Sequence, residues 1–159
     1  MKDKEKRVKA NIEKFIHFHK GRITLLKEFR DKRIHGRLIF QISFLGFESL
    51  AKLLYLNESS SKTRFISLLS VSNVGIRKKE ATDLYDRWRN SLIHQGFIIT
   101  PWTTIESWDE DDMSFLTFPN RFRSSTEFPP GSIIALYENL TKYLENHFKE
   151  RGIKELEVF

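Results

Sequence analysis

One short segment of this 159-residue chain combines side chains that can act together on a phosphodiester bond, namely Arg89, Asn90 and His94. Arginine stays protonated and offers a planar fork of donors to phosphate oxygens, where negative charge develops in the transition state. Histidine, with an ordinary pKa of about 6.5, takes or gives protons near neutral pH. Asn90 is expected to orient the histidine or to bond a phosphate oxygen. Because RNA carries its own nucleophile, the 2′-hydroxyl, these residue types suit RNA cleavage without a metal ion.

The segment ends a predicted amphipathic helix over residues 80–94. At about 100° and about 1.5 Å per residue, Arg89 and His94 point about 140° apart and lie about 7.5 Å apart along the helix axis. Both side chains reach one phosphate only if the helix is distorted near Gly96 or if a second copy of the helix supplies the partner residues. The second arrangement predicts a homodimer.

The run from Arg89 to His94, Arg-Asn-Ser-Leu-Ile-His, resembles the Arg, polar residue, then His signature of HEPN domains, which are helical bundles and often metal-independent ribonucleases. The predicted order of helices is similar as well: a long first helix, a second with Glu48 and Lys52 inside an apolar stretch, a short third, and then the motif helix. The resemblance is close over six residues and loose over most of the chain. The segment 97–131 departs from the minimal family bundle.

The resemblance implies catalytic roles for Arg89, Asn90 and His94 in a homodimer whose two motifs share one cleft. The two copies of His94 would divide the base and acid roles, and the products would be a 2′,3′-cyclic phosphate and a 5′-hydroxyl end. It further implies a toxin or a defence effector, in some cases with a nucleotidyltransferase antitoxin as partner. No metal and no cofactor are expected.

Two other interpretations of the motif stay open. Arg89 can pair with Asp86 or Glu48, and His94 can be an ordinary residue at a helix end, where the helix dipole favours it. Some members of the family have lost activity. The alternative function is therefore a non-catalytic module that binds RNA or another protein through the same dimer surface.

Positive charge is concentrated near the N-terminus. Residues 1–37 carry 13 Lys and Arg against 5 Asp and Glu, a net charge of +8, whereas the remaining 122 residues carry 14 against 16, a net charge of −2. Such a segment steers polyanions and binds phosphates without regard to sequence, so nucleic acid is an expected partner. Further RNA contacts are predicted at Lys78, Lys79, Arg121 and Arg123.

Apolar residues at helical spacing predict a mainly α fold, an up-and-down bundle of about five helices. The predicted helices cover about residues 4–33, 38–56, 62–71, 80–94 and 130–149. His35-Gly36 is expected to end the first helix, with Gly36 in the left-handed conformation. Serines within 57–61 are expected to cap the third helix.

The chain 1–159 is expected to form one domain, with residues 97–131 as an insert between the fourth and fifth helices. β-branched and aromatic residues flank the turn-like run Asp109 to Asp112, so a small β-hairpin is predicted around 97–118. Trp102, Trp108 and Phe118 within this insert are interpreted as packing residues rather than as platforms for bases.

Composition excludes several classes of protein. The absence of cysteine excludes a disulfide scaffold, a thiol nucleophile and a cysteine-ligated metal. The charged N-terminus lacks the apolar core of a signal peptide, and charged residues interrupt the most apolar window, so a cytoplasmic protein without a membrane span is expected. His17 and His19 are splayed around the first helix, which disfavours a shared metal and favours solvated or core histidines.

Overall fold

The structure, a computed structural model, describes residues 2–71, 74–90 and 129–151, and its regular elements within these ranges are all helical. They are α1 (Lys2–Asp31), α2 (Gly36–Leu54), α3 (Ser61–Val71), α4 (Lys78–Asp83), the π-helix η1 (Leu84–Arg89) and α7 (Pro130–Arg151). The prediction of a mainly helical fold is confirmed. The β-hairpin predicted around 97–118 lies outside the described residues.

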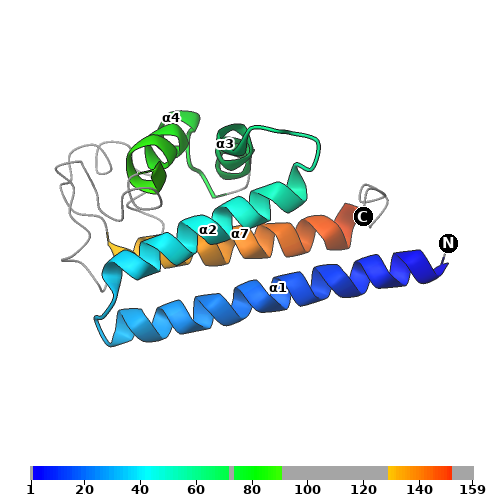
Figure 1. Ribbon diagram of the computed structural model, residues 1–159, viewed down its shortest axis with the longest axis horizontal. Helices are drawn as coiled ribbons and strands as arrows, with labels where there is room; N and C mark the ends of the chain where they lie inside the picture. The colour runs from blue at the N-terminus through cyan, green and yellow to red at the C-terminus, as the bar shows by residue number, and fades with distance from the viewer. Residues whose placement is uncertain (1, 72–73, 91–128, 152–159) are drawn as a thin grey trace.

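The described helices form three layers (Figure 1). α2 and α7 lie side by side in the middle, α1 packs against both of them, and α3 and α4 cover α2 from the opposite side. In Figure 1, α1 runs antiparallel to α2 and α7, and these two run in the same direction. The arrangement is a helical bundle in which α3 and α4 precede α7 in the chain and lie across α2 instead of extending the row of aligned helices.

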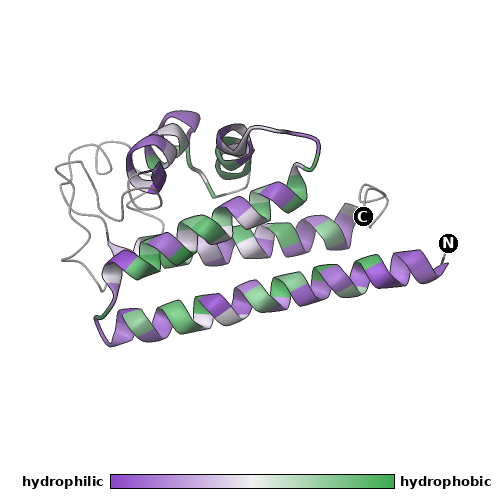
Figure 2. Cartoon of the chain, in the orientation of Figure 1, coloured by the Kyte–Doolittle hydropathy of each residue, from purple (hydrophilic) through white to green (hydrophobic). Residues whose placement is uncertain are grey.

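The long first helix is amphipathic, as its sequence predicts. Figure 2 shows hydrophilic and hydrophobic residues alternating along it. Its buried residues recur every three or four positions, which places them on one side of an α-helix: Val8, Ile12, Ile16, His19, Ile23 and Leu26. The helix continues through Gly21, where an added Cβ would meet no atom within 4 Å. One imidazole, that of His19, therefore occupies a core position.

The second helix lies at the centre of the hydrophobic core. The prediction that its apolar stretch forms a buried helix is therefore confirmed. Phe40, Phe44 and Phe47 have no exposed surface. Phe40 stacks on the buried Trp88 ring with centroids 5.4 Å apart, and this contact fixes η1 against α2. The packing holds the residue that follows Trp88, Arg89, close to the α2 surface.

The turn between α1 and α2 differs from its prediction. Gly36 is the first residue of α2, and the left-handed conformations belong to Arg33 (φ 54°) and His35 (φ 58°). The prediction that Gly36 adopts the left-handed conformation was wrong. A left-handed backbone costs a residue other than glycine about 1–2 kcal/mol, so the packing of α1 against α2 must offset this cost twice.

The ends of two other helices follow the sequence signals. The backbone N–H of Thr63 donates to Ser60 Oγ at 3.2 Å, which confirms a serine cap at the start of α3. α7 begins at Pro130, a position where the missing backbone N–H of proline costs nothing. Among the described helices, none combines the length and apolarity that a membrane span requires.

Candidate functional site

Arg89 is held at the end of η1 by a carboxylate of α2. Its Nε and Nη2 atoms donate to Glu48 Oε1 at 3.0 Å and 2.6 Å. The two side chains are mostly but not completely buried, with 12% of the Arg89 side chain and 19% of the Glu48 side chain exposed. The expectation that Arg89 pairs with Glu48 or Asp86 is thus met by Glu48. Asp86 instead pairs with Lys62 of α3 at 2.9 Å.

Two further side chains fix the plane of the guanidinium. Nη1 of Arg89 donates to Asn90 Oδ1 at 3.0 Å, and the Arg89 guanidinium carbon lies 5.0 Å from the centroid of the Tyr85 ring. Asn90 therefore orients the arginine, whereas the sequence assigned it to the histidine or to a phosphate. We call Glu48, Tyr85, Arg89 and Asn90 the Arg89 cluster. The guanidinium is therefore fixed in orientation, with its Nε–Nη2 edge bound by Glu48.

The fourth helix changes its hydrogen-bond pattern just before the motif. The backbone N–H of Asn90 donates to the carbonyl of Tyr85, five residues earlier, as in a π-helix. Such turns are rare and frequently lie at functional sites. A distortion near Gly96 was one of two arrangements that the sequence left open, and the described distortion lies earlier in the chain, over Leu84–Arg89. The wider turn sets the direction of Arg89 while Leu84, Tyr85 and Trp88 stay buried.

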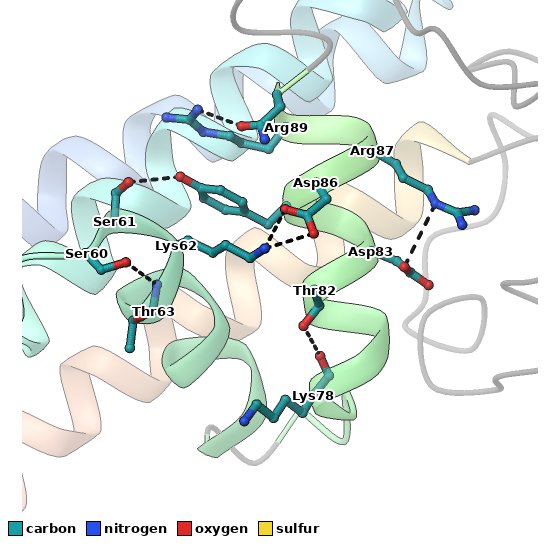
Figure 3. A network of polar contacts seen from close by, with 12 residues as sticks. Ser60, Ser61, Lys62, Thr63, Lys78, Thr82, Asp83, Asp86, Arg87 and Arg89 are labelled. Carbon is teal, nitrogen blue, oxygen red and sulfur yellow. Dashed lines mark hydrogen bonds and ion pairs between the residues drawn. The ribbon is translucent and has the colours of Figure 1, made fainter.

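The start of α3 braces the same region of η1. The hydroxyls of Ser61 and Tyr85 lie 2.9 Å apart, and Figure 3 shows Ser61 and Lys62 on α3 reaching toward the helix that carries Asp86 and Arg89. Glu48 also lines a shallow pocket between α2 and α3, together with Leu45, Ser49, Lys52, Ser61 and Arg64. The Arg89 cluster is therefore supported from two helices and borders an open polar surface.

The remaining predicted site residues are not gathered around Arg89. Lys78 and Lys79 are exposed and begin α4, about 16 Å away along the axis if the helix rises by about 1.5 Å per residue. Figure 3 shows Lys78 at the opposite end of that helix from Arg89. His94, Arg121 and Arg123 lie outside the described residues. The structure thus places Arg89 and Asn90 together and leaves the proposed role of His94 as a prediction.

Part of the positive charge of α1 is neutralised within the protein. Lys20 pairs with Glu145 and Lys27 pairs with Glu138 of α7, each at 2.9 Å. Hydrogen bonds from these lysines lower the pKa of both carboxyls. Most of the other basic side chains of α1 are exposed, and α1 lies on the far side of α2 from α3.

A buried polar pair was not anticipated from the sequence. His19 has no exposed surface, and its Nδ1 hydrogen-bonds the hydroxyl of the fully buried Tyr137. Burial, with a smaller effect of the Arg22 charge, lowers the pKa of His19 to about 4. Burial raises the pKa of Tyr137 to about 12, against an opposing effect of Arg22. The signal that could have revealed the pair is the position of His19 between Ile16 and Ile23 in the α1 stripe.

Within residues 2–71, 74–90 and 129–151, no three His, Cys, Asp or Glu side chains lie close enough together to hold a metal ion. His17 is exposed and His19 is buried, so the interpretation of the pair as a solvated and a core histidine is confirmed.

Comparison of the chain with protein-family models, with curated proteins and with solved structures found no match.

Proposed function

We propose that this protein is a metal-independent endoribonuclease of the HEPN kind that cleaves RNA by attack of the 2′-hydroxyl on the adjacent phosphate. The observation that carries the proposal is the Arg89 guanidinium, which Glu48 and Asn90 orient at a partly open surface. Arginine forks fixed in advance stabilise phosphorane charge well, because the protein need not reorganise during the reaction.

In the proposed reaction, the 2′-oxygen forms a bond to phosphorus as the bond to the 5′-oxygen breaks. A base removes the 2′-hydroxyl proton, and an acid supplies a proton to the departing 5′-oxygen. His94 is the proposed proton carrier, since imidazole titrates near neutral pH. Arg89 stabilises the two non-bridging oxygens. The products are a 2′,3′-cyclic phosphate and a 5′-hydroxyl end.

A homodimer is part of this proposal. Arg89 and His94 point in different directions from one ideal helix, so a second copy of the motif would bring the second imidazole into the cleft. Isologous interfaces of this type present the same surface from both subunits. A role as a toxin or defence effector, with a nucleotidyltransferase antitoxin as partner, belongs to the family resemblance alone.

The decisive experiment is cleavage of single-stranded RNA in EDTA by the wild type and by the variants Arg89→Ala and His94→Ala. Removing one group that stabilises developing charge lowers a rate by about 10²–10³-fold, so we expect losses of at least this size. Arg87→Ala is the matched control, because Arg87 lies on the same helix with a side chain that is 55% exposed and 3.9 Å from Asp83. Cleavage at wild-type rate by all four proteins would assign the activity to a contaminant or to another site.

A second function has one observation in its favour. Arg89 already binds Glu48 and Asn90 through its guanidinium, and only 12% of its side chain is exposed, as expected of a residue that joins η1 to α2. On this alternative, the protein is a non-catalytic module that binds RNA or protein through the same surface. Binding of RNA by the wild type, with no product after long incubation, would support the module and contradict the nuclease.

A further inference from the structure

The pocket beside the Arg89 cluster lies between the C-terminal half of α2 and the beginning of α3. Its volume is about 350 Å³, and it is lined by Leu45, Glu48, Ser49, Lys52, Ser61 and Arg64. Four of these six side chains carry a hydroxyl group or a positive charge. Because Glu48 both lines the pocket and binds Arg89, the pocket and the proposed cleavage site share one wall.

The charge of this pocket is positive. Lys52 is exposed, and among the residues that the structure describes it has no ion-pair partner. Arg64 donates from Nη1 to the backbone carbonyl of Glu58, which is a neutral acceptor. Among the lining residues that the structure describes, Glu48 carries the one carboxylate, and Arg89 already binds it. Within the described part of the chain, the two cations therefore face the pocket without a matching anion.

The remaining lining residues also suit a nucleotide, which has both a phosphate and an apolar surface. The hydroxyls of Ser49 and Ser61 can donate to phosphate oxygens. Leu45, whose surface is 46% exposed, gives an apolar wall against which a ribose or base can pack. An isolated inorganic anion has no apolar group that could pack against Leu45.

We propose that this pocket binds a second phosphodiester of the RNA strand, next to the one at Arg89, through Lys52 and Arg64. The inference rests on the proposed function for the identity of the strand, and it names two positioning residues for that substrate. Lys52 contributes charge alone, whereas the fork of Arg64 also sets orientation. The subsite holds the strand on α2 and α3 while Arg89 contacts the scissile phosphate.

The test measures binding apart from cleavage. A single-stranded all-deoxy oligonucleotide lacks the 2′-hydroxyl and cannot be cleaved by the proposed reaction, so its affinity is read by fluorescence anisotropy over a range of KCl concentrations. Each lost phosphate contact lowers the slope of log affinity against log salt by about 0.7 for a single strand. We expect this change in Lys52→Gln, with affinity lowered several-fold at low salt.

The matched control is Lys142→Gln, which removes the same charge from α7, where Lys142 lines a different pocket together with residues of α1. We expect its affinity to stay within twofold of the wild type and its salt slope to be unchanged. An equal effect of the two substitutions would mean that only net charge matters, and the subsite would be rejected.

Two variants of Arg64 separate charge from folding, because its bond to Glu58 also holds the loop before α3. Arg64→Gln should lower the salt slope as Lys52→Gln does, and Arg64→Lys should restore it. Thermal melts followed by circular dichroism identify any variant that is unfolded. A folded Arg64→Gln with the wild-type slope contradicts the role of Arg64.

The failure of the subsite can be told from the failure of the nuclease proposal. If the wild type cleaves RNA and Lys52→Gln leaves both KM and the salt slope unchanged, the subsite is wrong and the Arg89 site stands. If the wild type binds the oligonucleotide through Lys52 but cleaves no RNA, the nuclease is wrong and the subsite stands. Displacement of the oligonucleotide by inorganic phosphate at equal concentration would show a site for free phosphate instead, and would overturn the proposal for a strand.

Discussion

Two polar groupings of the molecule, the His19–Tyr137 pair and the Arg89 cluster, differ in what their burial allows. The pair lies between α1 and α7 and has no exposed surface. The cluster lies where η1 meets α2, and 12% of its arginine side chain reaches solvent. Both join helices that are distant in sequence, and the cluster borders an open pocket through Glu48.

The difference in burial corresponds to a difference in charge. Burying an isolated charge is very costly, so a fully buried titratable group usually becomes neutral. The lowered pKa of His19 and the raised pKa of Tyr137 keep both side chains neutral at pH 7. Arginine cannot lose its proton in this way, and Arg89 instead keeps a carboxylate partner near solvent. The pair therefore suits a structural role, and the cluster suits contact with an anion.

The largest effect is expected at Arg89, which carries the proposed activity. Arg89→Lys keeps the charge of the cluster but removes the planar fork, so RNA cleavage should fall by about 10²-fold or more. Single-turnover kinetics measure the loss, and urea unfolding checks that the variant is folded. Arg87→Lys is the control and should cleave at the wild-type rate. A fully active Arg89→Lys would show that the fork is not used.

The next effect tests whether the His19–Tyr137 pair is structural. The folded protein protonates His19 only near pH 4, whereas the unfolded chain does so near pH 6.5. Between these values the unfolded state binds more protons, so the contribution of His19 to the free energy of unfolding is fully present above pH 6.5 and is lost as the pH falls toward 4, by about 3 kcal/mol in total.

His19→Gln removes this titration, and its free energy of unfolding should change less between pH 7 and pH 4.5. Urea unfolding of both proteins at the two pH values gives the difference. Glu138 and Glu145, whose pKa values are lowered, also contribute to the free energy of unfolding. These contributions are lost only as the pH falls below the ordinary carboxyl range. Parallel losses of stability in the two proteins would show that His19 is already charged or exposed.

Two glycines give a smaller test of the packing around Tyr137, because one lies against its ring and the other lies in open space. A Cβ added at Gly46 would overlap the ring of Tyr137, whereas one added at Gly21 meets nothing within 4 Å. Gly46→Ala should lower the free energy of unfolding by about 2 kcal/mol through overpacking. Gly21→Ala should raise it by up to about 1 kcal/mol through helix propensity. Thermal melts should therefore move in opposite directions, and a shift of both in one direction would contradict the packing described for Tyr137.

The smallest effect is expected at the exposed ion pair between α3 and η1. Lys62 and Asp86 lie 2.9 Å apart with side chains 45% and 44% exposed, and exposed pairs contribute about 0–1 kcal/mol. Lys62→Gln should lower the free energy of unfolding by less than about 0.5 kcal/mol, as measured by urea unfolding. RNA cleavage should be unchanged. A loss comparable to that of Gly46→Ala would mean that this pair is part of the support for η1.

Much of the helical layout could be predicted because it depends on local patterns. The repeat of buried residues from Val8 to Leu26, the apolar α2 and the serine before α3 each act over one or two turns of chain. Their helices appear within a few residues of the predicted bounds. The fourth helix shows the limit of this reasoning, since helical spacing continues through residues 84–89 and gives no sign that their hydrogen bonds are those of a π-helix.

The candidate site was predictable only in part. The residue types at positions 89, 90 and 94 indicated phosphate chemistry, and Glu48 was one of two acids considered as partners for Arg89. Selection of Glu48 over Asp86 required the position of α2, 41 residues earlier in the chain. Lys52 and Arg64 lie on helices joined by a loop, and nothing in their spacing shows that they face one pocket.

By itself, the sequence determined that the chain forms amphipathic helices and that the fourth of them carries an adjacent arginine and asparagine, because these properties depend on neighbours along the chain. Only the tertiary structure decided which carboxylate holds Arg89, that His19 is buried against Tyr137, and that Arg33 and His35 adopt left-handed conformations. Each of these depends on contacts between helices far apart in sequence, where packing energy selects a partner or a backbone conformation that local preference does not favour.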